Sequence, residues 1–204
     1  MKNVILLADR YKTNIEGLLT WAFEFEDQPY FDGFRTLATN GVDKPVLNLF
    51  RMLGLMSGQQ LAVKSGHAVS LDAILNSGVT GEPDVNAIAT SGGRDVSVLI
   101  WNYHDDDVPA PGAAIELLIQ GLPGNVTRAH VRHYRIDGQH SNAYTVWKQS
   151  GSPQQPTGDQ YSRMLSAGRL AELTPREEIR TEKGEARLSF QLPRHAVSLL
   201  KVTW

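Results

Sequence analysis

The sequence contains no cysteine among its 204 residues. Disulfide frameworks, a thiol nucleophile and metal sites ligated by cysteine are therefore excluded. An excess of charge of one sign is also missing, because 20 Lys and Arg stand against 22 Asp and Glu, for a formal net charge of −2. Nucleic-acid binding needs clustered positive charge, so this balance predicts no nucleic-acid partner.

Long hydrophobic runs are absent as well, since none approaches the ~20 residues that cross a bilayer. The apolar stretch at residues 4–8 meets Asp9 and Arg10 too early for a signal peptide. We therefore expect a cytoplasmic protein without a membrane partner. No G-x-S-x-G elbow, P-loop or G-x-G-x-x-G motif occurs, which leaves serine-hydrolase and nucleotide-dependent chemistries without support.

Residues 1 to about 58 carry an α/β pattern. Apolar residues recur at helical spacing through residues 4–11 and again through residues 46–53. Between these predicted helices, residues 18–23 form a continuous apolar run, typical of a strand that is covered on both faces in a parallel sheet. A loop rich in Pro, Gly, Asp and Asn follows at residues 27–43. Helix, buried strand and helix indicate a piece of a wound α/β sheet or barrel.

From about residue 59 the pattern changes to short strands separated by turn signals. The predicted strands are 85–90, 96–103, 114–120, 126–136, 188–192 and 197–204. Repeated short strands at this spacing favour a β-sandwich. An insertion at residues 142–173 contains a helix-like stretch at 158–173, and insertions of this length are often functional. The predicted fold class is α+β and mostly β: a β-sandwich over residues 59–204, with a partial β/α-barrel element over residues 1–58.

The N-terminal pattern leaves both edges of a parallel sheet without a partner strand. Proteins normally cover such edges, because exposed backbone groups invite pairing with other chains. We therefore expect a homo-oligomer whose subunits complete or cover the open α/β edge.

Carboxylates are concentrated directly after the apolar run. Side chains alternate along a strand, so Glu24 and Glu26 are predicted to share one face, opposite to Phe23. Residues two apart on an extended strand are separated by ~7 Å. Glycoside hydrolysis needs two carboxyl groups at roughly 5–9 Å, one as proton donor and the other as nucleophile or base. Glu24 and Glu26 are therefore the candidate catalytic pair.

Aromatic and acidic neighbours of this pair suit the apolar faces and the hydroxyl groups of a sugar. The candidate substrate-binding residues are Trp21, Phe23, Asp27, Tyr30 and Asp32. Their position supports this interpretation, because α/β barrels place their sites at the C-terminal ends of parallel strands. The alternative is that the same residues form a solvated acidic loop.

The segment 104–107 reads His-Asp-Asp-Asp, and its carboxylates are ligands that a hard cation accepts. Its position between two predicted strands favours a solvated loop instead. His130 and His133 face opposite ways along one predicted strand, so they do not form a chelating pair. The sequence therefore predicts no metal site.

Several segments combine into a recognisable pattern. They are LLTWAFEFED at 18–27, GF at 33–34, NG at 40–41, KPVLN at 44–48, VLIWNY at 98–103, YRID at 134–137, SNAY at 141–144, WKQSGSP at 147–153 and LP at 192–193. Together they resemble the last barrel strand, loop and helix, and the accessory sandwich, of family 39 glycoside hydrolases, the β-xylosidases. The resemblance implies a (β/α)₈ barrel beside a β-sandwich, retaining hydrolysis of β-1,4-linked xylosides, and no metal or organic cofactor.

The resemblance assigns neither catalytic glutamate of the family to a residue of this chain. In the family these glutamates follow the fourth and seventh barrel strands, which precede the helix at residues 4–11. The acidic loop after the eighth strand does correspond, and the family contacts xylose hydroxyls there. By that correspondence Glu26 and Asp27 contact the substrate, with Trp21 and Glu24 as further candidates.

Two functions are compatible with this sequence. The first is a β-xylosidase-like glycoside hydrolase that acts on β-1,4-xylosides or short xylo-oligosaccharides, with Glu24 and Glu26 as its carboxylate pair and Asp27 or Asp32 as substitutes. The ~7 Å spacing of the pair is nearer the inverting range than the retaining one. The second is a non-catalytic truncated remnant, which serves as a carbohydrate-binding or structural interaction module.

Overall fold

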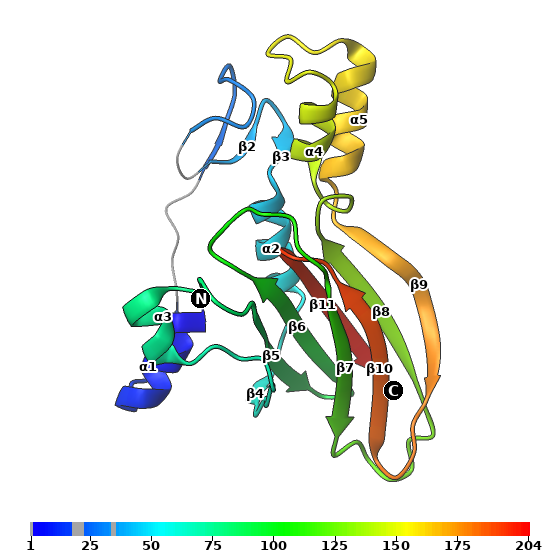
Figure 1. Ribbon diagram of the computed structural model, residues 1–204. Helices are drawn as coiled ribbons and strands as arrows, with labels where there is room; N and C mark the ends of the chain where they lie inside the picture. The colour runs from blue at the N-terminus through cyan, green and yellow to red at the C-terminus, as the bar shows by residue number, and fades with distance from the viewer. Residues whose placement is uncertain (1, 18–22, 34–35) are drawn as a thin grey trace.

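The computed structural model describes residues 2–17, 23–33 and 36–204. These residues form an α+β fold in which a tall unit of helices and short strands stands at one end of a β-sandwich (Figure 1). The described residues include no closed barrel. None of the helices among them is long and apolar enough to span a membrane.

Both helices predicted in the N-terminal part are confirmed. They are α1, Lys2–Tyr11, and α2, Pro45–Gly54. Proline occupies the first turn of α2, where its missing N–H costs no hydrogen bond. The apolar side of α2 packs on the sandwich, with Met52 fully buried and Leu49 and Leu53 beside it.

A small three-stranded sheet lies between these helices in the sequence. It has the order β1-β2-β3, with β1 at Phe23–Phe25, β2 at Thr36–Thr39 and β3 at Val42–Asp43. β1 pairs with β2 in parallel, and β2 pairs with β3 in an antiparallel hairpin. Two of these strands fall within the segment 27–43, so the prediction that this whole segment is a loop was wrong.

The hairpin turn explains that error. Asn40 and Gly41 both have positive φ, at 51° and 74°. A two-residue Asn-Gly turn of this kind matches the right-handed twist of the strands that it joins. The strands themselves span only four and two residues, too few for alternation to show in the sequence.

The expected burial of the first strand on both faces is not found in its described part. Phe23 is 46% exposed and Phe25 is 43% exposed. Burial on both faces needs a packed layer on each side of the strand, and none of the core clusters among the described residues includes Phe23 or Phe25. The remaining residues of the predicted run, 18–22, lie outside the described residues.

The sandwich has two antiparallel sheets of unequal size. The larger has the order β4-β5-β6-β11-β8-β9. Its strands are β4 Gln59–Leu61, β5 Asp84–Gly92, β6 Asp95–Tyr103, β8 Arg128–Ile136, β9 Ala171–Arg180 and β11 Ala196–Thr203. The smaller sheet pairs β7, Ala113–Gln120, with β10, Glu185–Leu192. All six predicted strands of this part are therefore confirmed.

Alternating side chains of the large sheet build two separate cores. On β6, Val98 and Ile100 face the small sheet and join its Ile115 and Leu192 in the inter-sheet core. The intervening Leu99 faces the other way and packs with Met52 of α2. One strand thus supplies both the sandwich core and the surface that carries the helices.

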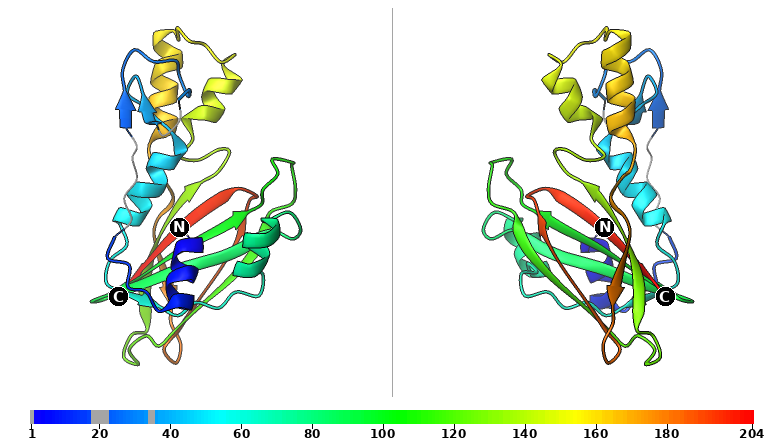
Figure 2. Two further views of the ribbon diagram at one scale, coloured as in Figure 1. Left: turned by 90° about the vertical axis from the view of Figure 1, so that its left-hand side faces the viewer. Right: turned by 90° about the vertical axis from the view of Figure 1, so that its right-hand side faces the viewer.

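The insertion between β8 and β9 forms two helices, α4 at Ala143–Gln149 and α5 at Gly158–Gly168. The predicted helix over 158–173 was too long, because Arg169 is already extended and β9 begins at Ala171. A buried cluster joins the insertion to the small sheet; its members are Tyr30, Val42, Ala143 and Met164. Figure 1 and Figure 2 show α4 and α5 beside β2 and β3 at one end of the molecule.

Helix α3, Leu71–Ser77, lies with α1 beside the sandwich, away from α4 and α5 (Figure 2). Arg10 of α1 and Asp72 of α3 form an ion pair at 2.8 Å. At the centre of the molecule, buried Asn48 of α2 donates from Nδ2 to the carbonyls of Ser141 and Gly168, at 3.1 and 2.7 Å. One amide therefore ties α2 to both ends of the insertion.

Candidate functional site

The acidic loop, residues 26–33, follows β1 and carries most of the predicted site residues. Glu24 lies within β1, and Glu26, Asp27 and Asp32 lie in the loop; all four side chains are exposed. Phe23 and Phe25 share a face of β1, because their rings meet edge to face at 5.9 Å. Trp21, a predicted substrate contact, lies outside the described residues.

Asn40 holds the start of this loop. Its Nδ2 donates to the carbonyl of Gln28 at 2.7 Å, and the Gln28 N–H donates back to its Oδ1 at 3.3 Å. The Asn40 N–H also donates to the carbonyl of Phe25 at 2.8 Å. Since β1 and β2 are parallel, their C-terminal ends meet at one edge, and the turn after β2 therefore reaches the loop after β1.

Lys44 holds the far end of the loop. Its ammonium donates to the carbonyl of Asp32 at 2.6 Å and also contacts the hydroxyl of Thr36. Burial lowers the pKa of Lys44, and the Asp32 carboxylate partly opposes that shift. The Asp32 carboxylate itself accepts the N–H of Gly33 at 2.7 Å.

A cavity of about 250 Å³ lies within this loop. Its lining residues are Phe25, Gln28, Pro29, Asp32, Gly33 and Thr36. Ligand pockets usually span about 300–1,000 Å³, so this one is smaller than a usual ligand pocket. Of the predicted site residues, the structure brings Asp32 into the cavity wall.

Tyr30 occupies a different environment from the other predicted contacts. Its side chain is only 8% exposed and packs against the insertion. Its backbone N–H donates to Oε1 of Gln154 at 2.8 Å. Burial raises the pKa of the phenol, with further contributions from Tyr161 and Glu26. Tyr30 thus fixes the loop to the insertion, and Glu26 lies close enough for its charge to act on the phenol.

An aromatic cluster continues the loop surface onto α4. Phe31 has its ring 5.4 Å from that of Tyr144 and 5.1 Å from that of Trp147. Phe31 also has a positive φ of 59°, an uncommon conformation for a bulky residue. The sequence analysis did not select Tyr144 or Trp147. Both residues fall within the family-like motifs at 141–144 and 147–153, but their contact with Phe31 joins segments more than 100 residues apart and could not be predicted from those motifs.

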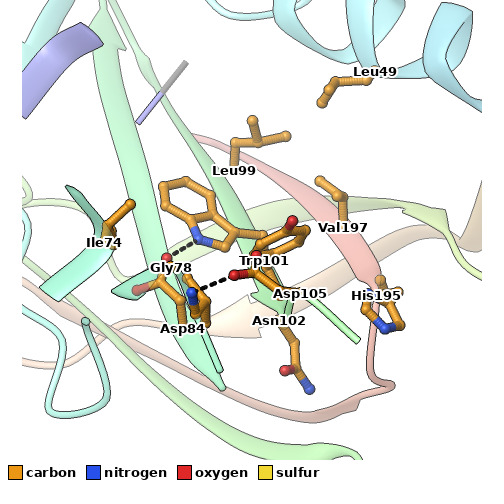
Figure 3. Close-up of a pocket in the computed structure, with 13 residues that line it drawn as sticks. Leu49, Ile74, Gly78, Asp84, Leu99, Trp101, Asn102, Asp105, His195 and Val197 are labelled. Atoms are coloured by element: carbon orange, nitrogen blue, oxygen red, sulfur yellow. Dashed lines mark hydrogen bonds between the residues drawn. The ribbon is translucent and has the colours of Figure 1, made fainter. Parts of the chain in front are cut away.

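A second and larger cavity, of about 750 Å³, lies between the large sheet, α2 and α3 (Figure 3). Trp101 of β6 forms part of its wall, and its indole N–H donates to Oδ2 of Asp84 at 2.7 Å. Asp84 is 2% exposed, and its Oδ1 accepts the N–H of Val69 at 2.8 Å. The sequence analysis missed this pair, because it depends on the β5–β6 register, which places Asp84 opposite Tyr103.

The mouth of this cavity is formed by the loop after β6 and the turn before β11. Asp105 accepts the N–H of Val79 at 2.6 Å and hydrogen-bonds the hydroxyl of Tyr103, which raises the pKa of that phenol. The ring of His195 meets the ring of Tyr103 edge to face at 6.1 Å. Nε2 of His195 lies 2.7 Å from the carbonyl of Asp106.

The prediction of a solvated loop at residues 104–107 was therefore only partly right. His104 is 6% exposed, and its Nε2 lies 2.9 Å from the carbonyl of Gly81. Asp106 pairs with Arg194 and keeps a half-exposed side chain. Within the described ranges, no group of three or more His, Asp or Glu residues could hold a metal ion.

The family model for glycosyl hydrolases family 39 matches residues 2–183. Alpha-L-iduronidase of Mus musculus is 30% identical over 164 residues, which cover 78% of this chain and 24% of that protein. A beta-xylosidase of Caldicellulosiruptor saccharolyticus is 23% identical over 142 residues, which cover 70% of this chain and 26% of that protein. The chain therefore spans about a quarter of the length of these relatives.

Solved structures show the same fold. A monomeric beta-xylosidase from Caulobacter crescentus CB15 aligns with a TM-score of 0.70 and 17% identity, over 96% of this chain and 39% of that one. The GH39 enzyme from Xanthomonas axonopodis pv. citri aligns with a TM-score of 0.68 and 16% identity, over 86% of this chain and 33% of that one. The arrangement of small sheet, insertion and sandwich is thus shared with larger enzymes.

Proposed function

The chain belongs to glycosyl hydrolase family 39, and from that premise we propose that it acts on β-1,4-linked xylosides or short xylo-oligosaccharides in the manner of a β-xylosidase. The observation that carries this proposal is the acidic loop, which is held at both ends beside a cavity. The loop is also the part of the chain that resembles the sugar-contacting segment of the β-xylosidases.

Glu24 and Glu26 are the proposed carboxylate pair. One protonates the glycosidic oxygen as the bond breaks, and the other either activates a water molecule or attacks the anomeric carbon. Asp27, Asp32 and the aromatic residues Trp21 and Phe23 are the proposed sugar contacts. Tyr30 anchors the loop to the insertion, since its side chain is buried there.

The charge of the loop favours a neutral sugar over a uronic acid. Glu24, Glu26, Asp27 and Asp32 present four carboxylates, whose negative charge repels the carboxylate of an iduronide. Among the residues that the structure describes, Lys44 is a cation that contacts the loop, and its ammonium already donates to the carbonyl of Asp32 and contacts the hydroxyl of Thr36. A xyloside carries no charge, so it avoids this repulsion. We therefore attribute the similarity to alpha-L-iduronidase to the shared fold. For the acidic loop we propose a xyloside as the substrate.

Sugar binding without hydrolysis is the second candidate, and one observation favours it. A general acid needs a raised pKa, which burial against apolar groups normally provides. Glu24 of β1 and the three carboxylates of the loop are all exposed, so catalysis requires the bound saccharide itself to exclude water from Glu24 or Glu26.

The test offers the purified chain an aryl β-xyloside and an aryl α-L-iduronide at equal concentrations. Release of the phenol from the xyloside alone is the expected result, and release from the iduronide alone overturns the substrate class. Calorimetric titration with xylobiose runs in parallel. Heat of binding without phenol release from either substrate selects the second candidate. If there is no heat of binding and no phenol release, both candidate functions are contradicted.

A further inference from the structure

We propose that the larger cavity is a second saccharide-binding site, in which a sugar ring stacks on the indole of Trp101. This site uses none of the acidic-loop residues. It rests on the carbohydrate chemistry of the family and not on the catalytic role proposed for Glu24 and Glu26.

The cavity has the size and the walls of a ligand site. Its volume of about 750 Å³ lies within the 300–1,000 Å³ that is usual for such pockets. Leu49 of α2, Ile74 of α3 and Leu99 and Val197 of the sheet supply apolar walls (Figure 3). Mostly apolar walls with a few convergent polar groups are typical of small-ligand sites.

Trp101 is fixed before any ligand arrives. Asp84 accepts the indole N–H through one carboxylate oxygen and holds the chain at Val69 through the other. Because the indole N–H is satisfied inside the protein, the ring offers a ligand its apolar surface. A ring that is already held in place loses little rotamer entropy on binding, which favours affinity.

Hydrogen-bond acceptors gather at the mouth. Asp105 carries an exposed carboxylate, and Tyr103, with 47% of its surface exposed, hydrogen-bonds to it. The carbonyl of Asp106 can only accept, so Nε2 of His195 is the donor in their contact. Sugar hydroxyls donate to such acceptors while the opposite face of the sugar ring packs on an aromatic ring. An apolar surface from a protein partner would instead desolvate Asp105 without adding a donor to those from Val79 and Tyr103.

The mouth is also held in a specific backbone geometry. His195 has a φ of 58°, which is rare outside glycine, and such strain is often found at functional sites. On the opposite side, Gly78 lines the cavity with a φ of 71°, and a Cβ there would lie 2.2 Å from Oδ2 of Asp105. Only glycine leaves the Asp105 carboxylate in place.

The test follows the indole N–H resonances of the ¹⁵N-labelled chain during titration with xylotriose. The chain has four tryptophans, and Trp101→Phe identifies the indole signal that comes from Trp101. The expected result is a saturable shift of the Trp101 signal, while the Trp204 signal stays in place. A Trp101 signal that xylotriose leaves unmoved overturns the proposal.

Variants test whether the cavity itself binds the sugar. Ile74→Trp fills the cavity from α3, and Asp84→Leu removes the acceptor that orients the indole; each is expected to weaken binding by about tenfold or more. Tyr11→Ala, which removes a 69% exposed aromatic side chain on α1, is the control and should bind as the parent does. Parent-like affinity in Ile74→Trp contradicts the proposal even if Asp84→Leu fails to fold.

The experiments distinguish a failure of the proposed acidic-loop function from a failure of the proposed Trp101 site. The double variant Glu24→Gln/Glu26→Gln changes only β1 and the acidic loop, so the Trp101 shift is expected to persist in it. Loss of that shift in the double variant would assign the binding to the acidic loop and overturn the second site.

Discussion

The side-chain amide of Asn40 and the backbone of Gln28 form a closed pair of hydrogen bonds, at 2.7 Å from Nδ2 to the carbonyl and at 3.3 Å from the N–H to Oδ1. This pair joins the hairpin turn after β2 to the start of the acidic loop. The position of the proposed sugar contacts therefore depends on a turn residue that is not itself acidic.

Replacing Asn40 tests this dependence. Asn40→Gly keeps the positive φ of the turn and removes the amide, so the loop loses its clamp without backbone strain. We expect a loss of about 1–2 kcal/mol in the free energy of unfolding, and weaker xylobiose binding by calorimetry. Lys183→Gly is the matched control, because Lys183 also has a positive φ before a glycine. Equal binding by both variants would show that the clamp does not position the site.

Asn48 is expected to be the most sensitive polar residue of the interior. It is fully buried, its Nδ2 serves two carbonyls, and its Oδ1 accepts from Arg51 at 2.9 Å. Asn48→Ala leaves the two carbonyls without their donor, which should cost about 2–4 kcal/mol. Urea unfolding measures this, with Asn76→Ala on the exposed surface of α3 as control. A cost below that of the control variant would contradict the role of Asn48 as the tie between α2 and the insertion.

Gly78 should tolerate no side chain. Its φ of 71° and the predicted contact of a Cβ with Asp105 both oppose substitution. Gly78→Ala is expected to lower stability by about 1–3 kcal/mol. Gly81→Ala serves as the control, since nothing lies within 4 Å of a Cβ there. Thermal melts of the two variants compare them, and identical melting temperatures would refute the prediction.

His133 should make the protein less stable in acid. Burial, with Arg135 and His140 adding to it, lowers the pKa of His133 to about 4. The unfolded chain, with a pKa near 6.5, therefore binds the proton first, and stability present above pH 6.5 is lost as the pH falls towards 4. Between pH 7 and pH 5 this amounts to about 2 kcal/mol.

His133→Gln isolates that contribution, because glutamine keeps a polar group near Ser198 and does not titrate. Urea unfolding at pH 7 and pH 5 should show a smaller pH dependence in the variant than in the parent. The same pH dependence in both proteins would assign the effect to other groups.

Sequence pattern predicted the elements with regular or continuous apolar positions. Helix α2 and strand β6 present regular apolar positions to a core, and both lie where the pattern placed them. Strand β9 was not predicted, because it is an edge strand whose many charged residues hide the apolar alternation of a strand. Cross-strand ion pairs, such as Arg132 with Glu172 at 2.7 Å, stabilise it in place of apolar burial.

The two candidate sites also differ in how far the sequence could predict them. The acidic loop is contiguous in the sequence, so its residues could be selected from their spacing alone. The Trp101–Asp84 pair and the contacts of Phe31 with α4 exist only after strands and helices far apart in the sequence have packed. The catalytic roles of Glu24 and Glu26 and the homo-oligomer remain predictions.

The most direct measurement of the central claim is the initial rate of nitrophenol release from an aryl β-xyloside by the parent chain and by Glu24→Gln/Glu26→Gln. Glu116→Gln, which alters an exposed carboxylate on β7, controls for the loss of charge. Turnover by the parent and the control, with none above background in the double variant, is the predicted result. Turnover by the double variant at the parent rate, or none by the parent, would contradict it.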